Sequence, residues 1–347
     1  MLPYASVVIP TYNRATLVGR AVRSVLTNIR PGDEVIVVDD GSTDDTRRAL
    51  AEFGPPVRVI TMPNGGAGRA RNRGLVEARH DIIAFLDSDD EWMPDRLELG
   101  RELLNARPDI LFCFSNFGLR DEYGRERHNG VREWLRREPS WDRDLGPAVR
   151  FSDLAGPPAI RADFAVHTGD LYRSLLDSCG VAVQTLLVRR TPSSVNLRFP
   201  EDLPMFEDWE YVASLARAGT AAYMDCETAW QWGHGGPRLT DQHADDITAS
   251  ATHIAILERV WGSDPTFIAA HGGALDVALR AERRALARAR FARGEIDAAR
   301  ALLRLAGDAP ASLRLLSLFP PRAIALIVML RRALKRIGNR ASFRRAR

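Results

Sequence analysis

The chain has 347 residues, of which 45% are hydrophobic and 27% charged, with a formal net charge of +3. These values are ordinary for a globular protein that buries a sizeable core, and we expect one large domain with an appendage. The three cysteines (Cys113, Cys179 and Cys226) are too few and too widely spaced for a disulfide framework or a zinc site, so we expect a reducing compartment.

The positive charge is concentrated near the C-terminus. Residues 322–347 contain nine Lys/Arg and no Asp/Glu, so the rest of the chain is net negative. We therefore expect no nucleic-acid groove. The first residues lack a basic region and the first apolar run stops at Pro10, so we expect no signal peptide. No stretch has the roughly 18 uncharged apolar residues that a membrane span needs.

Four apolar segments in the first ninety residues each run into a polar tip. The segments are 7–10, 35–38, 57–60 and 81–86, and the tips are 11–14, 39–42, 64–66 and 87–90. Helical stretches separate them, so we predict parallel strands joined by right-handed crossovers. The carboxyl ends of such strands face one crevice, where open α/β sheets bind ligands. Thr11, Asp40, Arg71 and an Asp-x-Asp pair in that crevice suit a metal-bound nucleoside diphosphate.

Helical spacing and capping residues predict the remaining elements of the first half. One face of the first helix carries Leu17, Val18, Ala21, Val22, Val25 and Leu26. The next helices are expected from Ser42 to Gly54, over about 67–78 and after Pro94, and a fifth strand at 110–115. We assign residues 1–118 to a nucleotide-binding half.

The later sequence is less regular. Periodicity fails over 121–170, which we interpret as an insertion with short helices anchored by Trp134 and Trp141. The elements expected after it are a strand at 181–188, a helix at 207–218, a strand near 221–224 and a Gly-rich loop or edge segment at 230–237. Everything beyond about 245 has a helical pattern, including a helix-turn-helix hinged at Gly294. We assign 119–244 to a second half and 245–347 to a C-terminal helical region with a basic tail.

Asp87 and Asp89 follow the fourth strand. Mg²⁺ and Mn²⁺ prefer oxygen ligands, and a diphosphate leaving group needs a cation to neutralise it. The position of both carboxylates at the shared strand edge favours a metal site, although a solvated acidic turn would have the same composition.

Asp39 and Asp40 end the second strand, where a carboxylate can accept a hydrogen bond from the imide N–H of uracil or thymine. A simple Asp-Asp-Gly turn is the alternative, and Thr11 could likewise merely end the first strand. In 64–72 the glycines leave backbone N–H groups open beside a helix start, which favours anions, and Arg71 can add a bidentate phosphate contact.

Two more motifs carry polar groups that suit chemistry. Glu207 and Asp208 open a helix, where the helix dipole favours acids; the functional alternative is a general base for an acceptor hydroxyl. His234 lies between Gly233 and 235–236, both glycines, a setting that favours a ligand or phosphate contact over a core position.

Together and in this order, these motifs resemble the inverting glycosyltransferases of family 2, which have the GT-A fold. The matching segments are 7–14, 38–44, 70–74, 85–90 and 206–210. The likeness is dense over about 5–118 and sparser over 180–240. It implies an α/β fold with a Rossmann-like, mostly parallel sheet flanked by helices, followed here by a C-terminal α-helical region.

The resemblance also implies roles for individual residues. They are uracil contacts from Thr11 and Asp40, a position near the phosphates for Arg71, a ribose contact from Asp87, Mn²⁺ or Mg²⁺ ligands from Asp89, Asp87 and His234, and the catalytic base from Asp208. Further nucleotide-sugar contacts are expected from Pro10, Tyr12, Arg14, Asp39, Asn64, Gly65 and Ser88. Residues 119–244 would then be the acceptor-binding half.

The implied reaction is an in-line attack of an acceptor hydroxyl on the anomeric carbon, with inversion. The donor would be a nucleoside-diphosphate sugar, with a UDP-sugar favoured, and the acceptor a hydroxyl compound such as a lipid-linked saccharide in cell-surface glycan synthesis. Residues 231–234 do not match the Gln-x-x-Arg-Trp motif of processive synthases. We therefore expect the addition of a single sugar.

Two rival functions share parts of this pattern. A nucleotidyltransferase that forms sugar nucleotides would have a Gly-rich first loop, whereas residues 11–14 contain no glycine. A non-catalytic binding module would not need Asp208.

The basic tail after Pro320-Pro321 joins a short apolar helix to arginines, which favours an anionic membrane surface. We expect a cytoplasmic protein with peripheral contact at the inner face of the membrane; a solvated basic terminus is the alternative.

Overall fold

The computed structural model describes residues 2–135, 139–233 and 245–307. The chain divides into two compact units. The first comprises Met1–Leu203 and Glu207–Gly236, and the second comprises Pro204–Phe206 and Pro237–Arg347. All the predicted site residues that the structure describes belong to the first unit.

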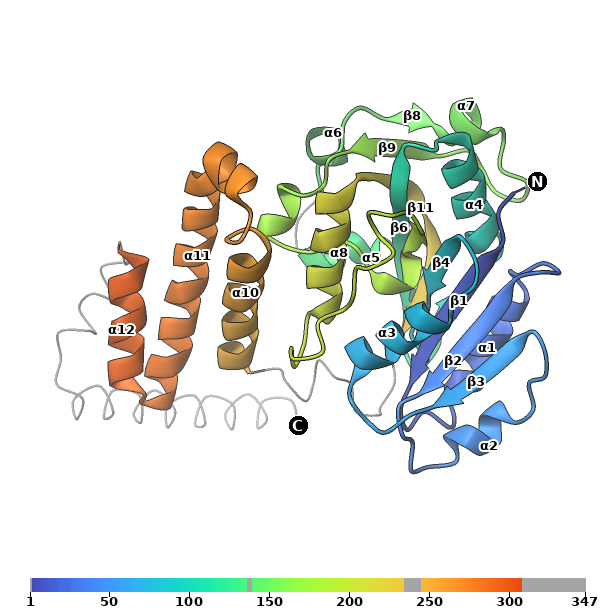
Figure 1. Ribbon diagram of the computed structural model, residues 1–347, viewed down its shortest axis with the longest axis horizontal. Helices are drawn as coiled ribbons and strands as arrows, with labels where there is room; N and C mark the ends of the chain where they lie inside the picture. The colour runs from blue at the N-terminus through green and yellow to red at the C-terminus, as the bar shows by residue number, and fades with distance from the viewer. Residues whose placement is uncertain (1, 136–138, 234–244, 308–347) are drawn as a thin grey trace, which may run out of the picture. The chain divides into compact units, whose positions relative to one another are not determined.

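The first unit is built around one mixed β-sheet (Figure 1). Its strand order is β3-β2-β1-β4-β10-β6-β11-β9-β8, with β5 paired to β11 and β7 to β6. The strands are β1 (Ala5–Thr11), β2 (Glu34–Asp39), β3 (Val57–Thr61), β4 (Ile82–Phe85), β5 (Glu91–Trp92), β6 (Ile110–Arg120), β7 (Glu126–Arg127), β8 (Val149–Arg150), β9 (Ala165–Gly169), β10 (Leu187–Arg189) and β11 (Thr220–Trp232). Strands β1 to β4 are parallel, as are β6 and β11, while β9 and β10 are antiparallel to their neighbours. The predicted mostly parallel sheet is thus confirmed.

Helices lie on both faces of the sheet (Figure 1). Successive side chains of a central strand point to opposite faces and so reach different helices. Val7 and Ile9 share a buried cluster with Val22 of α1 (Val18–Leu26). Val8 points the other way, toward α3 (Ala67–Glu77), and a Cβ atom at Gly74 would lie only 2.2 Å from its Cγ1. Glycine at position 74 therefore permits the close approach of α3 to β1.

Two expected boundaries were wrong. The second helix, α2 (Thr46–Leu50), begins four residues after Ser42 because the Ser42 hydroxyl and one Asp44 oxygen bind the loop after β1. The other Asp44 oxygen accepts from the N–H of Thr46, the first residue of α2, at 3.0 Å. Ser42 Oγ accepts from the Asn13 N–H at 2.9 Å, and Asp44 accepts from the Ala15 N–H at 3.2 Å. The strand expected at 181–188 is a 3₁₀ turn (Val183–Thr185) followed by the short β10.

Other elements agree with the sequence or extend it. Helices α4 (Arg96–Ala106) and α8 (Glu207–Ala218) lie where they were predicted. Strands β6 and β11 are longer than predicted, because they pair along their length as far as Arg120 and Trp232. The register shifts of β11 near Glu227 interrupt the alternation that would reveal its length.

The insertion contains the short helices α5 (Gly130–Leu135), α6 (Trp141–Asp144) and α7 (Phe151–Ala155). Trp141 stacks on Tyr223 of β11 with ring centroids 4.2 Å apart, and Trp134 packs edge-on against Phe117 of β6 at 4.7 Å. Both tryptophans thus attach the insertion to the sheet, as predicted.

The second unit is mainly helical over residues 246–306. It contains α10 (Asp246–Val260), α11 (Pro265–Arg293) and α12 (Ile296–Ala306), and Gly294 ends α11 in the left-handed conformation, with φ of 87°. Within 2–135, 139–233 and 245–307, no helix has both the length and the apolar character that a bilayer span requires. The apolar segment and basic tail of 320–347 lie outside the described residues.

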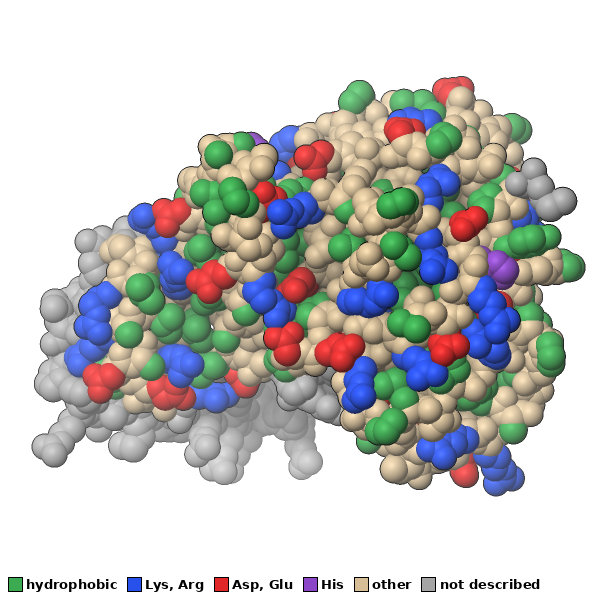
Figure 2. Space-filling view, in the orientation of Figure 1, with side chains coloured by type: hydrophobic (Ala, Val, Ile, Leu, Met, Phe, Trp, Pro, Cys, Tyr) green, Lys and Arg blue, Asp and Glu red, His purple; other side chains and the backbone are tan. Residues whose placement is uncertain are grey.

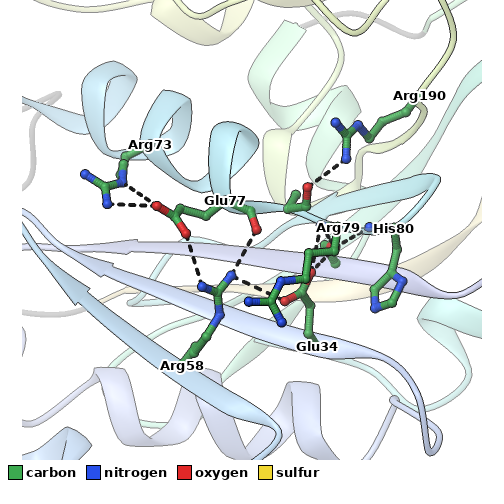
Figure 3. A network of polar contacts seen from close by, with 9 residues as sticks. Glu34, Arg58, Arg73, Glu77, Arg79, His80 and Arg190 are labelled. Atoms are coloured by element: carbon green, nitrogen blue, oxygen red, sulfur yellow. Dashed lines mark hydrogen bonds and ion pairs between the residues drawn. The ribbon is translucent and has the colours of Figure 1, made fainter.

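A polar network ties the amino-terminal edge of the first strands together (Figure 3). Glu34 at the start of β2 accepts from the Ser6 hydroxyl at 2.7 Å and from the Arg79 N–H at 2.8 Å. Arg58 of β3 bridges Glu34 and Glu77, at 3.4 and 3.1 Å. Acidic and basic side chains are also intermixed over the face shown in Figure 2.

Candidate functional site

The carboxyl ends of β1, β2 and β4 bring three predicted segments to one edge of the sheet. Thr11 is paired with Asp39 in the parallel register, and the Asp40 N–H donates to the Thr11 carbonyl at 2.9 Å. Leu86, just before Asp87, donates its N–H to the carbonyl of Val8 at 3.1 Å. Residues of three strand tips are therefore neighbours in space.

The two aspartates after β2 have different environments. Asp39 is fully buried, and its oxygens accept from the Ser42 N–H and from Arg47 Nε, both at 2.9 Å. Asp40 accepts from the N–H groups of Gly65 and Gly66, at 2.9 and 2.8 Å. Burial raises the pKa of Asp40, and these N–H groups oppose the shift. The glycine N–H groups that were expected to be open to anions thus bind Asp40 in this structure.

Other predicted nucleotide contacts surround this point. Asn64 Nδ2 donates to Asp40 at 3.1 Å, while the Tyr12 side chain is exposed and Pro10 is buried inside β1. The Thr11 hydroxyl is buried and has no hydrogen-bond partner among the described residues. A buried polar group in this state suits a ligand that supplies the missing partner.

Arg71 of α3 joins the tip of β4 to the start of α8. Its Nη2 lies 2.7 Å from Asp87 Oδ1, and its Nη1 lies 2.7 Å from Glu207 Oε1. The side chain is only 6% exposed. Burial alone would lower the pKa of Arg71, but the two carboxylates outweigh it and raise that pKa. Residues 136 positions apart in the sequence are thereby held in one cluster.

Asp208 lies beside this cluster at the first turn of α8. Burial raises its pKa to about 7, the adjacent Glu207 carboxylate adds to the shift, and Arg71 opposes it. Asp87 is close enough to contribute in the same direction. A carboxylate with a pKa near neutrality is suited to exchange protons at physiological pH.

The segment after β4 carries the predicted metal ligands. Burial raises the pKa of Asp87, Arg71 opposes the shift, and the charge of Asp89 adds to it. The Asp89 carboxylate lies 3.3 Å from Arg14 Nη2, and Ser88 between the two aspartates is buried. The predicted residues Arg14, Arg71, Asp87, Asp89 and Asp208 are therefore brought together.

This donor set fits a divalent cation. Asp89 pairs with Arg14, and Asp87 and Glu207 pair with Arg71, so three carboxylates meet two guanidinium groups and negative charge is in excess. Two carboxylate ligands supplemented by phosphate oxygens are a usual set for Mg²⁺. No group of three His, Cys, Asp or Glu side chains suited to a metal occurs within the described part of the chain, and His234 lies outside it.

Sequence reasoning missed the residues that support the Asp89 segment. Arg20 of α1 donates to the Asp89 carbonyl at 2.6 Å, and its guanidinium lies 4.0 Å from the centroid of the Trp232 ring. The Trp232 N–H donates to Asp90 Oδ1 at 3.1 Å, although the two are 142 residues apart. No local pattern predicts this contact, because it depends on β11 reaching the same edge of the sheet as β4.

Comparison with known proteins identifies relatives of both the sequence and the fold. Residues 6–154 match the model of the family described as glycosyl transferase family 2. The Escherichia coli protein named UDP-Glc:alpha-D-GlcNAc-diphosphoundecaprenol beta-1,3-glucosyltransferase WfgD is 34% identical over 225 residues, which are 64% of this chain and 73% of WfgD. The Bacillus subtilis protein named putative teichuronic acid biosynthesis glycosyltransferase TuaG is 38% identical over 126 residues, which are 35% of this chain. The chain spans 50% of the length of TuaG and 31% of an uncharacterized Rickettsia conorii glycosyltransferase.

Two solved structures share the fold. Staphylococcus aureus TarS 1–349 in complex with UDP-GlcNAc has a TM-score of 0.54 at 16% identity, covering 86% of this chain and 88% of TarS 1–349. The mannosyltransferase PcManGT of Pyrobaculum calidifontis, in complex with GDP-Man and Mn²⁺, has a TM-score of 0.51 at 19% identity, covering 95% and 87%. At these identities the likeness concerns the fold alone.

Proposed function

The chain belongs to glycosyl transferase family 2, with the GT-A fold, and we propose that it transfers a single sugar from a nucleoside-diphosphate sugar to a hydroxyl acceptor. The observation that carries this proposal is the double ion pair of Arg71 with Asp87 and Glu207. It holds the carboxylates at the tips of the parallel strands near Asp208, where a donor and an acceptor hydroxyl would meet.

A uridine nucleotide is the favoured donor carrier. Asp40 and the unpartnered Thr11 hydroxyl end adjacent strands, and both suit the imide edge of uracil. The relative WfgD is named for UDP-Glc, and TarS was solved with UDP-GlcNAc. PcManGT was solved with GDP-Man, so a GDP-sugar is the alternative donor.

Asp89, with Asp87 beside it, would hold Mn²⁺ or Mg²⁺, and His234 is proposed as an additional contact. When bound, the cation neutralises negative charge on the departing diphosphate. Arg14 and Arg71 can share this task by binding phosphate oxygens, since their guanidinium groups already lie against the two aspartates.

Asp208 is proposed to act as the general base. Its carboxylate takes the proton of the acceptor hydroxyl while the hydroxyl oxygen forms a bond to the anomeric carbon. The bond from that carbon to the diphosphate breaks on the opposite side, which inverts the configuration. A pKa of about 7 leaves a large fraction of Asp208 ionised and ready for this step at neutral pH.

The acceptor is proposed to be a lipid-linked saccharide used in cell-surface glycan synthesis. WfgD is named for a diphosphoundecaprenol-linked GlcNAc, and TuaG for teichuronic acid biosynthesis. The basic tail would then hold the protein at the inner face of the cytoplasmic membrane. Flotation with anionic vesicles, with and without residues 320–347, tests this part; equal recovery of both forms would refute it.

A thermal-shift panel of UDP-, dTDP-, GDP- and CMP-sugars with and without Mn²⁺ tests the donor proposal. We expect stabilisation by a UDP- or dTDP-sugar that depends on Mn²⁺. Stabilisation by none of them would contradict it, and release of pyrophosphate from a nucleoside triphosphate and a sugar phosphate would instead indicate a nucleotidyltransferase.

A further inference from the structure

One face of α3 packs against the loop that leads to the proposed base. Gly68, Arg71 and Asn72 are spaced i, i+3 and i+4 along the helix, so they lie on the same face. Arg71 binds Glu207, as described above, and the other two residues contact the loop that precedes α8. The proposed reaction gives a role to Arg71 but none to Gly68 or Asn72.

Asn72 holds this loop through both ends of its amide group. Its Oδ1 accepts from the Phe199 N–H at 2.8 Å. Its Nδ2 donates to the Phe199 carbonyl at 2.8 Å and to Glu201 Oε1 at 2.9 Å. Asn72 is only 6% exposed. Because both hydrogen-bonding groups of the Phe199 backbone are bound by one buried side chain, the position and the orientation of this backbone are fixed.

Gly68 permits the closest approach between the helix and the loop. A Cβ atom at position 68 would lie 2.6 Å from the Pro200 carbonyl oxygen and 3.4 Å from Glu207 Cγ. A distance of 2.6 Å is too short for a carbon and an oxygen atom that are not bonded, and a backbone carbonyl cannot rotate away as the end of a long side chain can. Any larger residue must therefore push the loop away from α3.

Three buried aromatic rings connect the loop to α8 and to β4. The Phe199 ring stacks on Tyr211 with centroids 3.9 Å apart and an interplanar angle of 17°. Phe85, the last residue of β4, packs edge-on against both rings, at 5.4 and 6.0 Å. Tyr211 follows Asp208 by three residues on α8, so the two share a face of that helix. The loop thus contacts both the strand that ends beside Asp87 and the helix that carries Asp208.

We propose that Gly68 and Asn72 are positioning residues for Asp208. The inference rests on the proposed function, because Asp208 is the proposed base. By holding residues 199–201 against α3, Gly68 and Asn72 set the place of the first turn of α8 relative to the tip of β4. Catalysis is sensitive to such placement, since a shift of about 1 Å in a reacting group can lower the rate by about 10²-fold.

Crystal structures of Gly68→Ala and Asn72→Ala, superposed on β1, β2 and β4 of the wild type, test the positioning directly. We expect residues 199–201 and the Asp208 carboxylate to shift by about 0.5 to 1 Å, because the loop loses its hydrogen bonds or is pushed away. Gly54→Ala is the matched control, since a Cβ atom there meets nothing within 4 Å, and it should leave Asp208 in place. Asp208 at its wild-type position in either variant would overturn the inference for that residue.

Mn²⁺-dependent release of UDP from UDP-glucose and UDP-GlcNAc measures the effect on catalysis. We expect kcat to fall by about 10- to 100-fold in both variants, with the Kd of UDP, measured by calorimetry, unchanged. Arg73→Ala removes a side chain of α3 that is 46% exposed, and this control should keep the wild-type kcat. A loss of stability in urea with an unchanged kcat would mean that Gly68 and Asn72 only stabilise the fold, which would overturn the proposal.

Gly68→Ala guards against a loss of folding in Asn72→Ala, because alanine favours a helix more than glycine does and the change removes no hydrogen bond. The failure of the proposed function has a different signature. A wild type that does not bind UDP, or that releases it from neither sugar, would contradict transfer from a UDP-sugar. The crystal structures would still decide whether Gly68 and Asn72 position Asp208.

Discussion

Carboxylates at the two ends of the parallel strands have pKa values that are shifted in opposite directions. At the amino-terminal end, Glu77 accepts from Arg58 and Arg73, and these hydrogen bonds lower its pKa (Figure 3). At the carboxyl-terminal end, burial raises the pKa of Asp87 and that of Asp208, despite the positive charge of Arg71 between them.

This contrast distinguishes carboxylates that stabilise the fold from carboxylates that suit a functional site. Carboxylates whose oxygens all accept hydrogen bonds from neighbouring side chains stabilise the edge of a sheet and need no further partner. Buried carboxylates held close together repel one another, and a bound cation, a proton or a ligand can reduce this repulsion. Groups with strongly shifted pKa values are for this reason common at functional sites.

The largest effect is expected from Asp208→Asn, which removes the proposed base. Sugar transfer should fall by about 10²- to 10⁴-fold, the usual contribution of general base catalysis. UDP binding, measured by calorimetry, should persist because the proposed donor site lies at the strand tips and not at Asp208. Glu210→Gln, in the same turn of α8, is the matched control and should remain active; transfer by Asp208→Asn at the wild-type rate would refute the assignment.

Arginine substitutions compare the two ends directly. Arg71→Gln leaves the partly exposed carboxylates of Asp87 and Glu207 without their buried counter-charge and should cost about 2 to 3 kcal/mol of unfolding free energy, less than for a fully buried pair. Arg58→Gln breaks pairs whose arginine side chain is 35% exposed, and should cost about 1 kcal/mol or less. Urea denaturation at pH 7 measures both; equal losses would mean that the two ends do not differ.

The pH dependence of stability should have opposite signs at the two ends. The folded state retains a proton on Asp208 up to about pH 7, whereas the unfolded state releases it near 3.8. Its ionisation therefore lowers stability as pH rises through this window, and Asp208→Asn should gain about 1 to 2 kcal/mol over wild type between pH 4 and 8. A constant difference between the two proteins across these pH values would contradict the raised pKa.

The smallest effect is expected from Glu77→Gln. The pKa of Glu77 is lowered from 4.5 on folding, so its contribution to stability is present at neutral pH and is lost as the pH falls below that value. Thermal unfolding should therefore show a slight deficit at pH 7 that disappears in acid. Sugar transfer should be unchanged, and a large loss of activity would connect this network to the site.

The sequence predicted most of the nucleotide half because local signals there agree with the fold. Apolar strands, polar tips and the acids of α8 are each visible in a few consecutive residues. The helix predicted from Ser42 begins later than expected. The Ser42 hydroxyl and an Asp44 oxygen accept hydrogen bonds from the N–H groups of Asn13 and Ala15, which lie about thirty residues earlier.

Long-range partners could not be predicted. The pairing of Arg71 with Glu207 and the contact of Arg20 with Trp232 depend on how α8 and β11 meet the first strands. Likewise, the hydrogen bonds from the Gly65 and Gly66 N–H groups to Asp40 depend on the path of a loop. The sequence pattern therefore indicated these N–H groups but not the carboxylate that they bind.

The most direct test of the account is a crystal structure of Asp208→Asn with UDP and Mn²⁺, using anomalous scattering to locate the metal. We predict Mn²⁺ about 2 Å from an oxygen of Asp89, with diphosphate oxygens completing its coordination and the side chain of residue 208 facing the bound diphosphate. Mn²⁺ bound away from Asp89, or UDP bound away from the tips of β1, β2 and β4, would contradict it.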